Sequence, residues 1–116
     1  MTEQDCLFCK IVSGDVPATV VRETDRTLAF RDINPQAPTH VLVVPKAHHP
    51  TAADLASSDA GLLAELVRGT HEVAVAEGVA ESGYRVVFNT GPGAGQTVFH
   101  VHAHVLGGRG LNWPPG

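Results

Sequence analysis

The spacing of hydrophobic positions changes along the chain and predicts two helices. Between residues 58 and 77, apolar side chains recur every three or four positions and charged side chains occupy the opposite side, so one long helix is expected there. Ser58 or Asp59 can cap its start. A shorter repeat, followed by Gly14, predicts a short helix over residues 5–13.

Shorter segments rich in β-branched and apolar side chains predict strands. They cover residues 19–23, 27–32, 40–44, 84–89 and 98–106. A short polar turn joins the first two into a hairpin, and Pro45 ends the third. This order of elements predicts one α+β domain over residues 1–116, with an antiparallel sheet.

Composition narrows the possible functions. With 43% apolar and 17% charged residues, the 116-residue chain can build one core, but it is too short for two domains. The net charge is −4 and the eight Lys and Arg are scattered, so no basic stripe for long nucleic acid is present, and a bound nucleotide should be small. No apolar run approaches the roughly 20 residues of a membrane span, so a cytoplasmic protein without a membrane partner is expected.

Two cysteines, Cys6 and Cys9, are separated by two residues in a chain that also carries seven histidines. In a reducing cytosol, this spacing favours metal binding or redox chemistry over a structural disulfide. Reduced, partly buried thiols without a metal remain the alternative.

Three histidines, His100, His102 and His104, alternate with apolar residues in the last predicted strand. A strand would place their rings on one face, roughly 7 Å apart. Clustered imidazoles carry desolvation and repulsion costs without a structural return, which favours a functional role. The triad alone fits either nucleophilic catalysis or a three-histidine metal site.

The segment before the triad, residues 91–97, is rich in glycine and contains a hydroxyl group. Such a loop suits a phosphate, because its amides can approach an anion closely. It lacks the ending of a P-loop and the helix that follows a dinucleotide-binding loop, so a tight turn between strands explains it equally well. A hydrolytic zinc site would instead be expected to have a carboxylate base nearby.

Several motifs resemble those of the histidine triad (HIT) family. They are the His-x-His-x-His stretch, Gly95-Gln96-Thr97, Asp32-Ile33, Pro38-Thr39-His40 and the ending Trp113-Pro114-Pro115-Gly116. The ending is similar to the purine nucleoside phosphoramidase branch rather than the dinucleoside polyphosphate branch. The resemblance covers residues 6–116 and implies a HIT-like fold with a five-stranded antiparallel sheet. It also implies a homodimer in which the long helix and the Tyr84 strand pair with their copies to form one ten-stranded sheet.

The resemblance implies that His102 is a nucleophile that attacks the α-phosphorus of a purine nucleoside monophosphate derivative. Water would then hydrolyse the nucleotidyl-imidazole intermediate. By the same resemblance, His100 and His104 would frame His102, and His40 and His104 would belong to the hydrogen-bond network that sets its tautomer. Thr97 also belongs to the catalytic group, although close relatives carry serine there and the added methyl is expected to crowd the leaving amine.

The resemblance also implies the substrate contacts. Asp32 would accept hydrogen bonds from the ribose, although an aspartate after a strand is also an ordinary turn residue. The phosphate and leaving group would meet Asn89, Gly95, Gln96, Thr97 and Val98. An apolar slot for the purine would consist of Leu7, Phe8, Ile11, Phe30, Ile33 and Leu42, all of which could equally be core residues. Trp113 would come from the partner subunit, or else anchor the end of its own chain.

Some family members bind zinc through such cysteines, a histidine like His48 and the first triad histidine, here His100. Two thiolates and two imidazoles form a closed tetrahedral set, so a structural Zn²⁺ is expected and a catalytic metal is not. His49 adjoins His48, and either could be the ligand.

The sequence thus predicts hydrolysis of the P–N bond in purine nucleoside phosphoramidates or in related acyl and aminoacyl adenylates. The ligand would be an AMP or GMP derivative, and no residue pattern chooses between adenine and guanine. One alternative is hydrolysis or phosphorolysis of dinucleoside polyphosphates. Another is a non-catalytic regulatory module that binds AMP in the same pocket.

Overall fold

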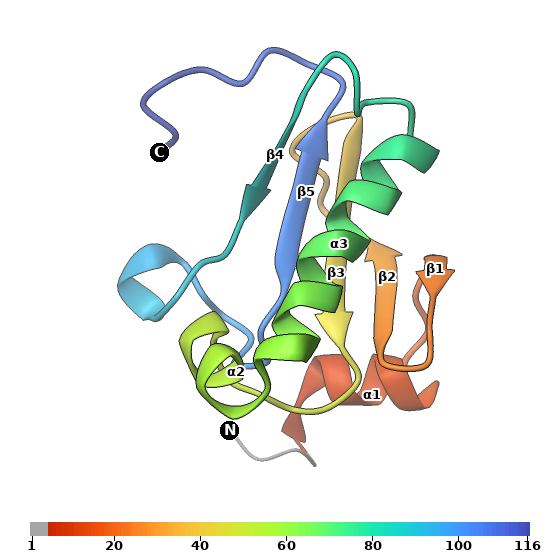
Figure 1. The fold of residues 1–116 in the computed structure, drawn as a ribbon, viewed down its shortest axis with the longest axis vertical. Helices are drawn as coiled ribbons and strands as arrows, with labels where there is room; N and C mark the ends of the chain where they lie inside the picture. The colour runs from red at the N-terminus through yellow and green to blue at the C-terminus, as the bar shows by residue number, and fades with distance from the viewer. Residues whose placement is uncertain (1–4) are drawn as a thin grey trace.

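The structure, a computed structural model that describes residues 5–116, is built on a five-stranded antiparallel sheet (Figure 1). Its strands lie in the order β1-β2-β3-β5-β4, which leaves β1 and β4 at the edges. Their bounds are β1 Val20–Glu23, β2 Thr27–Arg31, β3 Thr39–Pro45, β4 Tyr84–Val87 and β5 Ala103–Gly107. The predicted α+β fold is therefore confirmed.

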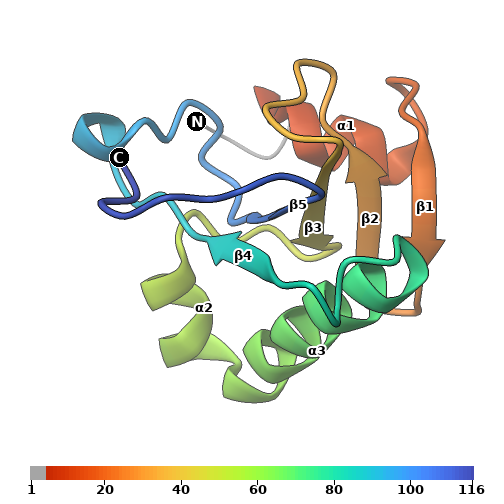
Figure 2. The ribbon, with the colours of Figure 1, turned by 90° about the horizontal axis from the view of Figure 1, so that it is seen from above.

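Helices cover both faces of the sheet. They are α1 Leu7–Ser13, α2 Ala52–Ser58 and α3 Ala60–Ala76, with a short 3₁₀ turn, η2, at Pro92–Ala94. Figure 2 shows α1 on one side of the sheet and α2 and α3 on the other. Among the described residues, no helix is long and apolar enough to cross a membrane.

Each face of the sheet has its own core. Between the sheet and the long helix lie Leu62, Leu66 and Val73, packed against the strand residues that point to that side. Between the sheet and α1 lies a second cluster that includes Phe8, Phe30 and Leu42. Because strand side chains alternate between faces, β3 contributes to both cores. The histidines of the candidate site lie beside the second cluster.

The long helix begins at Ala60, with Asp59 as its cap: the Asp59 carboxylate accepts a hydrogen bond from the Leu62 amide at 3.0 Å. Ser58, the other predicted cap, instead ends α2, a helix that the sequence analysis missed. Only Leu55 of this helix is buried, so no apolar repeat marks it. Its available signal was Thr51, which caps the first turn.

The last strand is shorter than predicted, because β5 begins at Ala103 rather than at residue 98. Its ladder with β3 ends at the pair Val43 and Ala103. Farther along β3, Pro45 has no amide hydrogen to donate, and its carbonyl oxygen accepts a hydrogen bond from the His100 ring. The Val101 amide donates to the His49 carbonyl instead of to a strand.

The prediction that three histidine rings share one strand face is therefore wrong. His100 and His102 precede the strand, and only His104 lies in it. The centroids of the His102 and His104 rings lie 5.0 Å apart, compared with the expected spacing of roughly 7 Å. Similarly, β4 ends at Val87, two residues before its predicted end.

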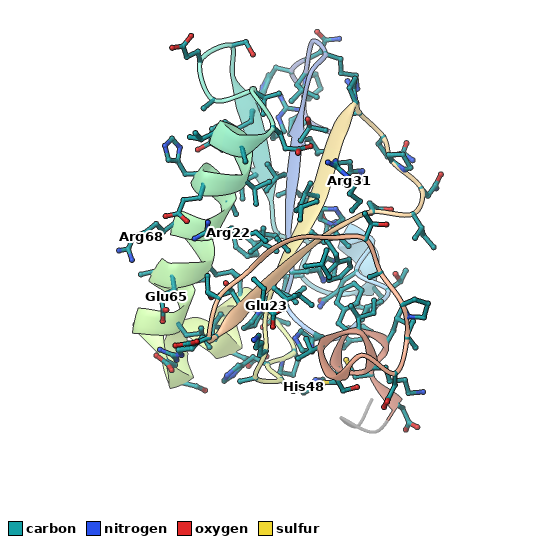
Figure 3. The ribbon with its side chains drawn as sticks, turned by 90° about the vertical axis from the view of Figure 1, so that its right-hand side faces the viewer. Arg22, Glu23, Arg31, His48, Glu65 and Arg68 are labelled. Atoms are coloured by element: carbon teal, nitrogen blue, oxygen red, sulfur yellow. The ribbon has the colours of Figure 1, made fainter. Side chains whose placement is uncertain are left out.

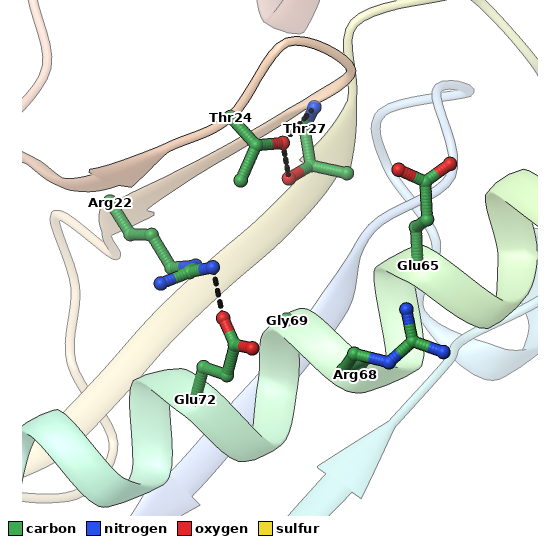
Figure 4. A pocket seen from close by; sticks show the side chains of 7 residues that line it. All are labelled: Arg22, Thr24, Thr27, Glu65, Arg68, Gly69 and Glu72. Atoms are coloured by element: carbon green, nitrogen blue, oxygen red, sulfur yellow. Dashed lines mark hydrogen bonds and ion pairs between the residues drawn. The ribbon is translucent and has the colours of Figure 1, made fainter.

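Ion pairs join the hairpin of β1 and β2 to the long helix (Figure 3). Arg22 contacts Glu72 across a pocket (Figure 4). Arg26 contacts Glu65, another residue that lines this pocket, at 2.8 Å. Arg68 also lines this pocket. Its lining contains two arginines and two glutamates but no histidine or cysteine, so it lacks the chemistry that the opposite face carries.

Candidate active site

His102 is a buried imidazole, 9% exposed, whose tautomer is determined by its surroundings. Its Nδ1 lies 2.8 Å from the main-chain carbonyl oxygen of His100. A carbonyl oxygen only accepts, so Nδ1 must carry the proton. In the neutral ring, Nε2 then has a free lone pair, which is the form that a nucleophile requires.

The environment also favours the neutral form of His102. Burial lowers its pKa, and the hydrogen bond to the His100 carbonyl and the charge of Asp32 only partly oppose this effect. The Phe8 ring meets the His102 ring edge to face, with centroids 4.9 Å apart and an interplanar angle of 89°. His102 is therefore neutral and packed against an aromatic wall.

A hydrogen-bond chain sets the tautomer of the third triad histidine. The Gln36 amide donates to His40 Nδ1 at 3.0 Å, so the proton of the neutral His40 ring lies on Nε2. This Nε2 donates to His104 Nδ1 at 2.9 Å, which leaves the His104 proton on its own Nε2. Burial lowers the pKa of His40, against the opposing charge of Asp32, and lowers the pKa of His104 to about 4.

Asp32, His40 and His104 place one potential metal-ligand atom each within 4.8 Å of one another. A metal requires an unprotonated nitrogen, but the Gln36 amide leaves the proton on His40 Nε2. Asp32 Oδ2 lies 3.4 Å from the same atom, as an additional acceptor. This group therefore fits a hydrogen-bond chain better than a metal site.

A second cluster has the chemistry of a metal site. Ligand atoms of Cys6, Cys9, His48 and His100 all lie within 4.8 Å of one another. His48 Nδ1 is 3.4 Å from Cys9 Sγ, and His100 Nδ1 is 3.4 and 3.5 Å from the two sulfurs. Around a tetrahedral zinc ion, sulfur and nitrogen ligands are separated by about 3.6 Å, from bond lengths of about 2.3 and 2.0–2.1 Å. The four residues fit the ion.

His100 has the tautomer that this cluster needs. Its Nε2 donates to the Pro45 carbonyl at 2.8 Å, so Nδ1, the atom between the sulfurs, has the free lone pair. Burial lowers the pKa of His100 to about 4, assisted by the neighbouring histidines His48, His102 and His49. The ring is therefore neutral, as a ligand must be.

The structure separates the two adjacent candidate ligands. His48 joins the cysteines, and Figure 3 shows it beside α1. His49 lines a different pocket together with Asp25 and Asp59, and its carbonyl oxygen accepts from Val101. The geometry therefore favours His48 as the fourth ligand.

The His104 imidazole should make the fold sensitive to acid. Its folded pKa of about 4 lies below the ordinary value of 6.5, so between these values the unfolded chain binds more protons. The free energy of unfolding should then fall as the pH is lowered from 6.5 to 4. We expect His104→Gln to remove on the order of 1–2 kcal/mol of this loss, after allowance for partial solvent screening.

Urea unfolding at pH 7 and pH 4.5 measures this difference. His49→Gln, whose side chain lines a separate pocket with Asp25 and Asp59, controls for the removal of one imidazole. An equal loss of stability in wild type and His104→Gln would contradict the assignment of acid sensitivity to this ring.

A family model described as HIT domain matches residues 13–111. The chain belongs to the HIT domain family. A crystal structure of a HIT family hydrolase from Legionella pneumophila is 54% identical, covers 97% of this chain and 100% of its own, and has a TM-score of 0.93. The matched fold and the histidine site lie within the same domain.

Two curated relatives of this HIT domain carry informative names. The 14 kDa zinc-binding protein of Zea mays is 46% identical over 118 residues, 100% of this chain and 91% of that protein. Adenylylsulfatase HINT1 of Arabidopsis thaliana is 43% identical over 117 residues, 99% of this chain and 79% of that protein. Together with the Legionella structure, they support a HIT family hydrolase.

In this HIT domain, the glycine-rich loop contains η2 and presents Gly95 and Thr97 to solvent. Gly95 has a φ of 89°, a left-handed conformation that glycine adopts without a steric cost. Gln96 was predicted to contact substrate, but it is only 3% exposed. Its side chain accepts from Gly91 and donates to two carbonyl groups, of Pro50 and Val98, so it supports the loop from beneath.

The predicted purine slot is only partly assembled. Phe8, Phe30 and Leu42 share one buried cluster, against which Ile11 and Val98 pack. The other two predicted slot residues are exposed, Leu7 by 43% and Ile33 by 100%. Asn89 is half-buried beyond the end of β4, and Trp113 is 83% exposed.

Two groups that organise the HIT site escaped sequence analysis, the amide of Gln36 and the carbonyl of Pro45. Each determines the tautomer of a histidine. Both are main-chain groups, which every residue carries, so no residue type signals them. Pro45 was recognised only as the end of a strand.

Proposed function

We propose that the chain hydrolyses purine nucleoside phosphoramidates and related adenylyl compounds through a nucleotidyl intermediate on His102. The observation that carries this proposal is the hydrogen bond from His102 Nδ1 to the His100 carbonyl, which leaves Nε2 unprotonated in a buried, neutral ring. The family match and the similar structures support a HIT family hydrolase.

In the first step, the lone pair of His102 Nε2 forms a bond to the α-phosphorus while the P–N bond breaks. The leaving amine departs with the bonding electrons and takes up a proton from solvent. His104, whose proton is on Nε2, can donate a hydrogen bond to a phosphoryl oxygen, where negative charge accumulates. Thr97 lies exposed on the adjacent loop and is assigned to the leaving group.

In the second step, water attacks the phosphorus and loses a proton to solvent, while the bond to His102 Nε2 breaks, its electrons return to the nitrogen and AMP leaves. Throughout, Nδ1 keeps its proton and donates it in a hydrogen bond to the His100 carbonyl, so the ring is regenerated in its starting tautomer. The positive charge that arises on the phosphorylated ring lies in a site where Asp32 supplies a negative charge. This residue is half-buried and is also assigned to the ribose hydroxyls.

The other contacts with the purine, the phosphate and the leaving group are assigned to the residues that the family resemblance implies. Phe8, Phe30, Leu42 and Ile11 are assigned to the purine slot, with Leu7 and Ile33 at its exposed margin. Asn89, Gly95 and Val98 are assigned to the phosphate and leaving group. The Arabidopsis relative is named an adenylylsulfatase, which shares the adenylyl half of the substrate and differs in the leaving group.

We propose that Cys6, Cys9, His48 and His100 hold a structural Zn²⁺. The name of the Zea mays relative and the spacing of the ligand atoms support this assignment. Four protein ligands leave no position for substrate, so the ion supplies a cross-link between α1, the loop after β3 and the segment before β5. His102 acts outside this ligand set.

We further propose that the protein acts as a dimer through β4 and α3. The outer edge of β4 is unpaired in the sheet, and all four of its residues are only partly buried. On the long helix, Val67 is 47% exposed. Pairing two copies at this edge would join their sheets and cover this apolar surface, and Trp113 is assigned to the partner's substrate site.

Val67→Glu should dissociate this dimer, because it places a charge in the apolar contact. Light scattering should then report one chain of 12.2 kDa instead of two. Val20→Glu is the matched control, since Val20 is 48% exposed but lies at the opposite edge, on β1. A dimer that survives Val67→Glu but not Val20→Glu would place the interface at the other edge.

Steady-state hydrolysis of adenosine 5′-phosphoramidate and of diadenosine tetraphosphate tests the proposed function. We expect kcat/KM to be at least about 100-fold higher for the phosphoramidate. The opposite order would favour the dinucleoside polyphosphate reaction. AMP binding without turnover of either compound would favour the regulatory module.

A further inference from the structure

We propose that the metal-ligand cluster positions the nucleophile, so that His100 holds His102 in its reactive tautomer only when the cluster is loaded. This inference rests on the proposed function for its kinetic consequence, but its structural part can be measured without substrate. It assigns to the Cys/His cluster an effect on kcat in addition to its effect on stability.

The first observation is that one residue belongs to both sites. The His100 ring is fully buried and lies in the metal-ligand cluster. Its main-chain carbonyl is the acceptor for His102 Nδ1. A rotation of the peptide that carries this carbonyl would take the acceptor away from that proton. The position of the ring therefore constrains the tautomer of the nucleophile.

The second observation is that protein groups hold the His100 ring by one strong contact. Its Nε2 donates to Pro45 at 2.8 Å, whereas Nδ1 faces two sulfurs at 3.4 and 3.5 Å. Thiols are weak hydrogen-bond partners. A metal–nitrogen bond is shorter and more directional, so loading restricts the ring and the backbone attached to it.

The third observation is that helix α1 links the cysteine ligands to the His102 ring by a second set of contacts. Cys6 is the N-cap of α1, where its sulfur accepts from the Cys9 amide at 3.4 Å. The same helix carries Phe8, whose ring lies against His102. A metal held by both cysteines therefore fixes the start of this helix and, with it, the aromatic wall of the nucleophile.

A backbone bond ties the two histidine segments together. The Val101 amide donates to the His49 carbonyl at 2.7 Å. Val101 lies between His100 and His102 in the sequence, and His49 follows the ligand His48. Displacement of His48 on metal loss would therefore be passed to the peptide bonds on either side of Val101. One of these carries the His100 carbonyl.

The experiment compares the zinc-loaded and the chelated protein after uniform labelling of histidine with ¹⁵N. Long-range ¹H–¹⁵N spectra at one neutral pH report which nitrogen of His102 carries the proton, and kcat and KM for adenosine 5′-phosphoramidate are measured on the same samples. We expect only the Nδ1–H tautomer when zinc is bound, and a mixture after chelation. The value of kcat should fall about tenfold, with KM changed less than about twofold.

Three variants separate positioning from general stability. His48→Ala should reproduce the chelated spectrum, whereas His48→Cys, which restores a four-ligand set, should bind zinc and recover both the tautomer and kcat. His49→Gln is the matched control, because this side chain lies outside the cluster and its carbonyl is kept. Circular dichroism checks that each sample is folded. If His48→Ala does not fold, the chelated wild type provides the metal-free comparison in its place.

An unchanged His102 spectrum and unchanged kcat after zinc removal would overturn the inference. A change in KM alone would also overturn it, because the proposed effect is on the reactive tautomer. If the loaded wild type does not hydrolyse the phosphoramidate, the proposed function fails. The tautomer measured with and without zinc still decides the positioning role in that case.

Discussion

In His102→Asn, hydrolysis of adenosine 5′-phosphoramidate should fall by about 1,000-fold or more. Asparagine retains a donor for the His100 carbonyl but has no basic nitrogen to attack phosphorus, so the nucleotidyl intermediate cannot form. AMP binding should persist, since the apolar residues assigned to the purine slot are unchanged. Rapid quenching and mass spectrometry should detect a mass increase of one nucleotidyl group in the wild type only.

His49→Asn is the control for this experiment. Its side chain lies outside the Cys/His cluster and lines a separate pocket with Asp25 and Asp59, so this variant should leave kcat unchanged. A His102→Asn enzyme that retains a tenth or more of the wild-type rate would exclude His102 as the nucleophile.

Removal of the metal should strongly destabilise the protein. A ligand present at 1,000 times its dissociation constant stabilises the folded state by about 4 kcal/mol, so chelation of bound zinc should lower Tm by on the order of 10 °C or more. The cluster joins three segments that are distant in sequence, so its loss should weaken the contacts among all three. Calorimetry with and without a chelator, under reducing conditions, measures the shift.

Cys9→Ala provides the control for chelation. It removes a sulfur that lies near both histidine ligands, so it should start from the lower Tm and show no further response to the chelator. An equal response of this variant and the wild type would mean that the chelator acts elsewhere.

Sequence analysis predicted the elements whose buried apolar side chains recur at regular spacing along the chain. The repeat in α3 predicts its buried face, because Leu62, Leu66 and Val73 all pack on the sheet. Helix α2 has a single buried side chain, so the same method finds nothing there. The early end of the β5 ladder depends on Pro45, which belongs to a different segment of the chain.

In the candidate site, too, the sequence revealed the residue types but not the features that depend on tertiary contacts. The spacing of the cysteines and the alternation of the triad marked Cys6, Cys9, His100 and His102, and the structure brings their rings and sulfurs into adjoining clusters. Their tautomers were not predictable, because they depend on tertiary contacts with main-chain groups. The choice between His48 and His49 depends on loop geometry for the same reason.

The short β5 strand has a consequence for how the molecule opens. The segment that carries His100 and His102 lies outside the β-ladder and is bonded to the loop after β3, through Pro45 and His49. In amide hydrogen exchange, protection of Val101 should therefore follow local opening of that loop, independently of the central strands. We therefore expect the segment that carries His102 to open separately from the strands β3 and β5, which carry His40 and His104.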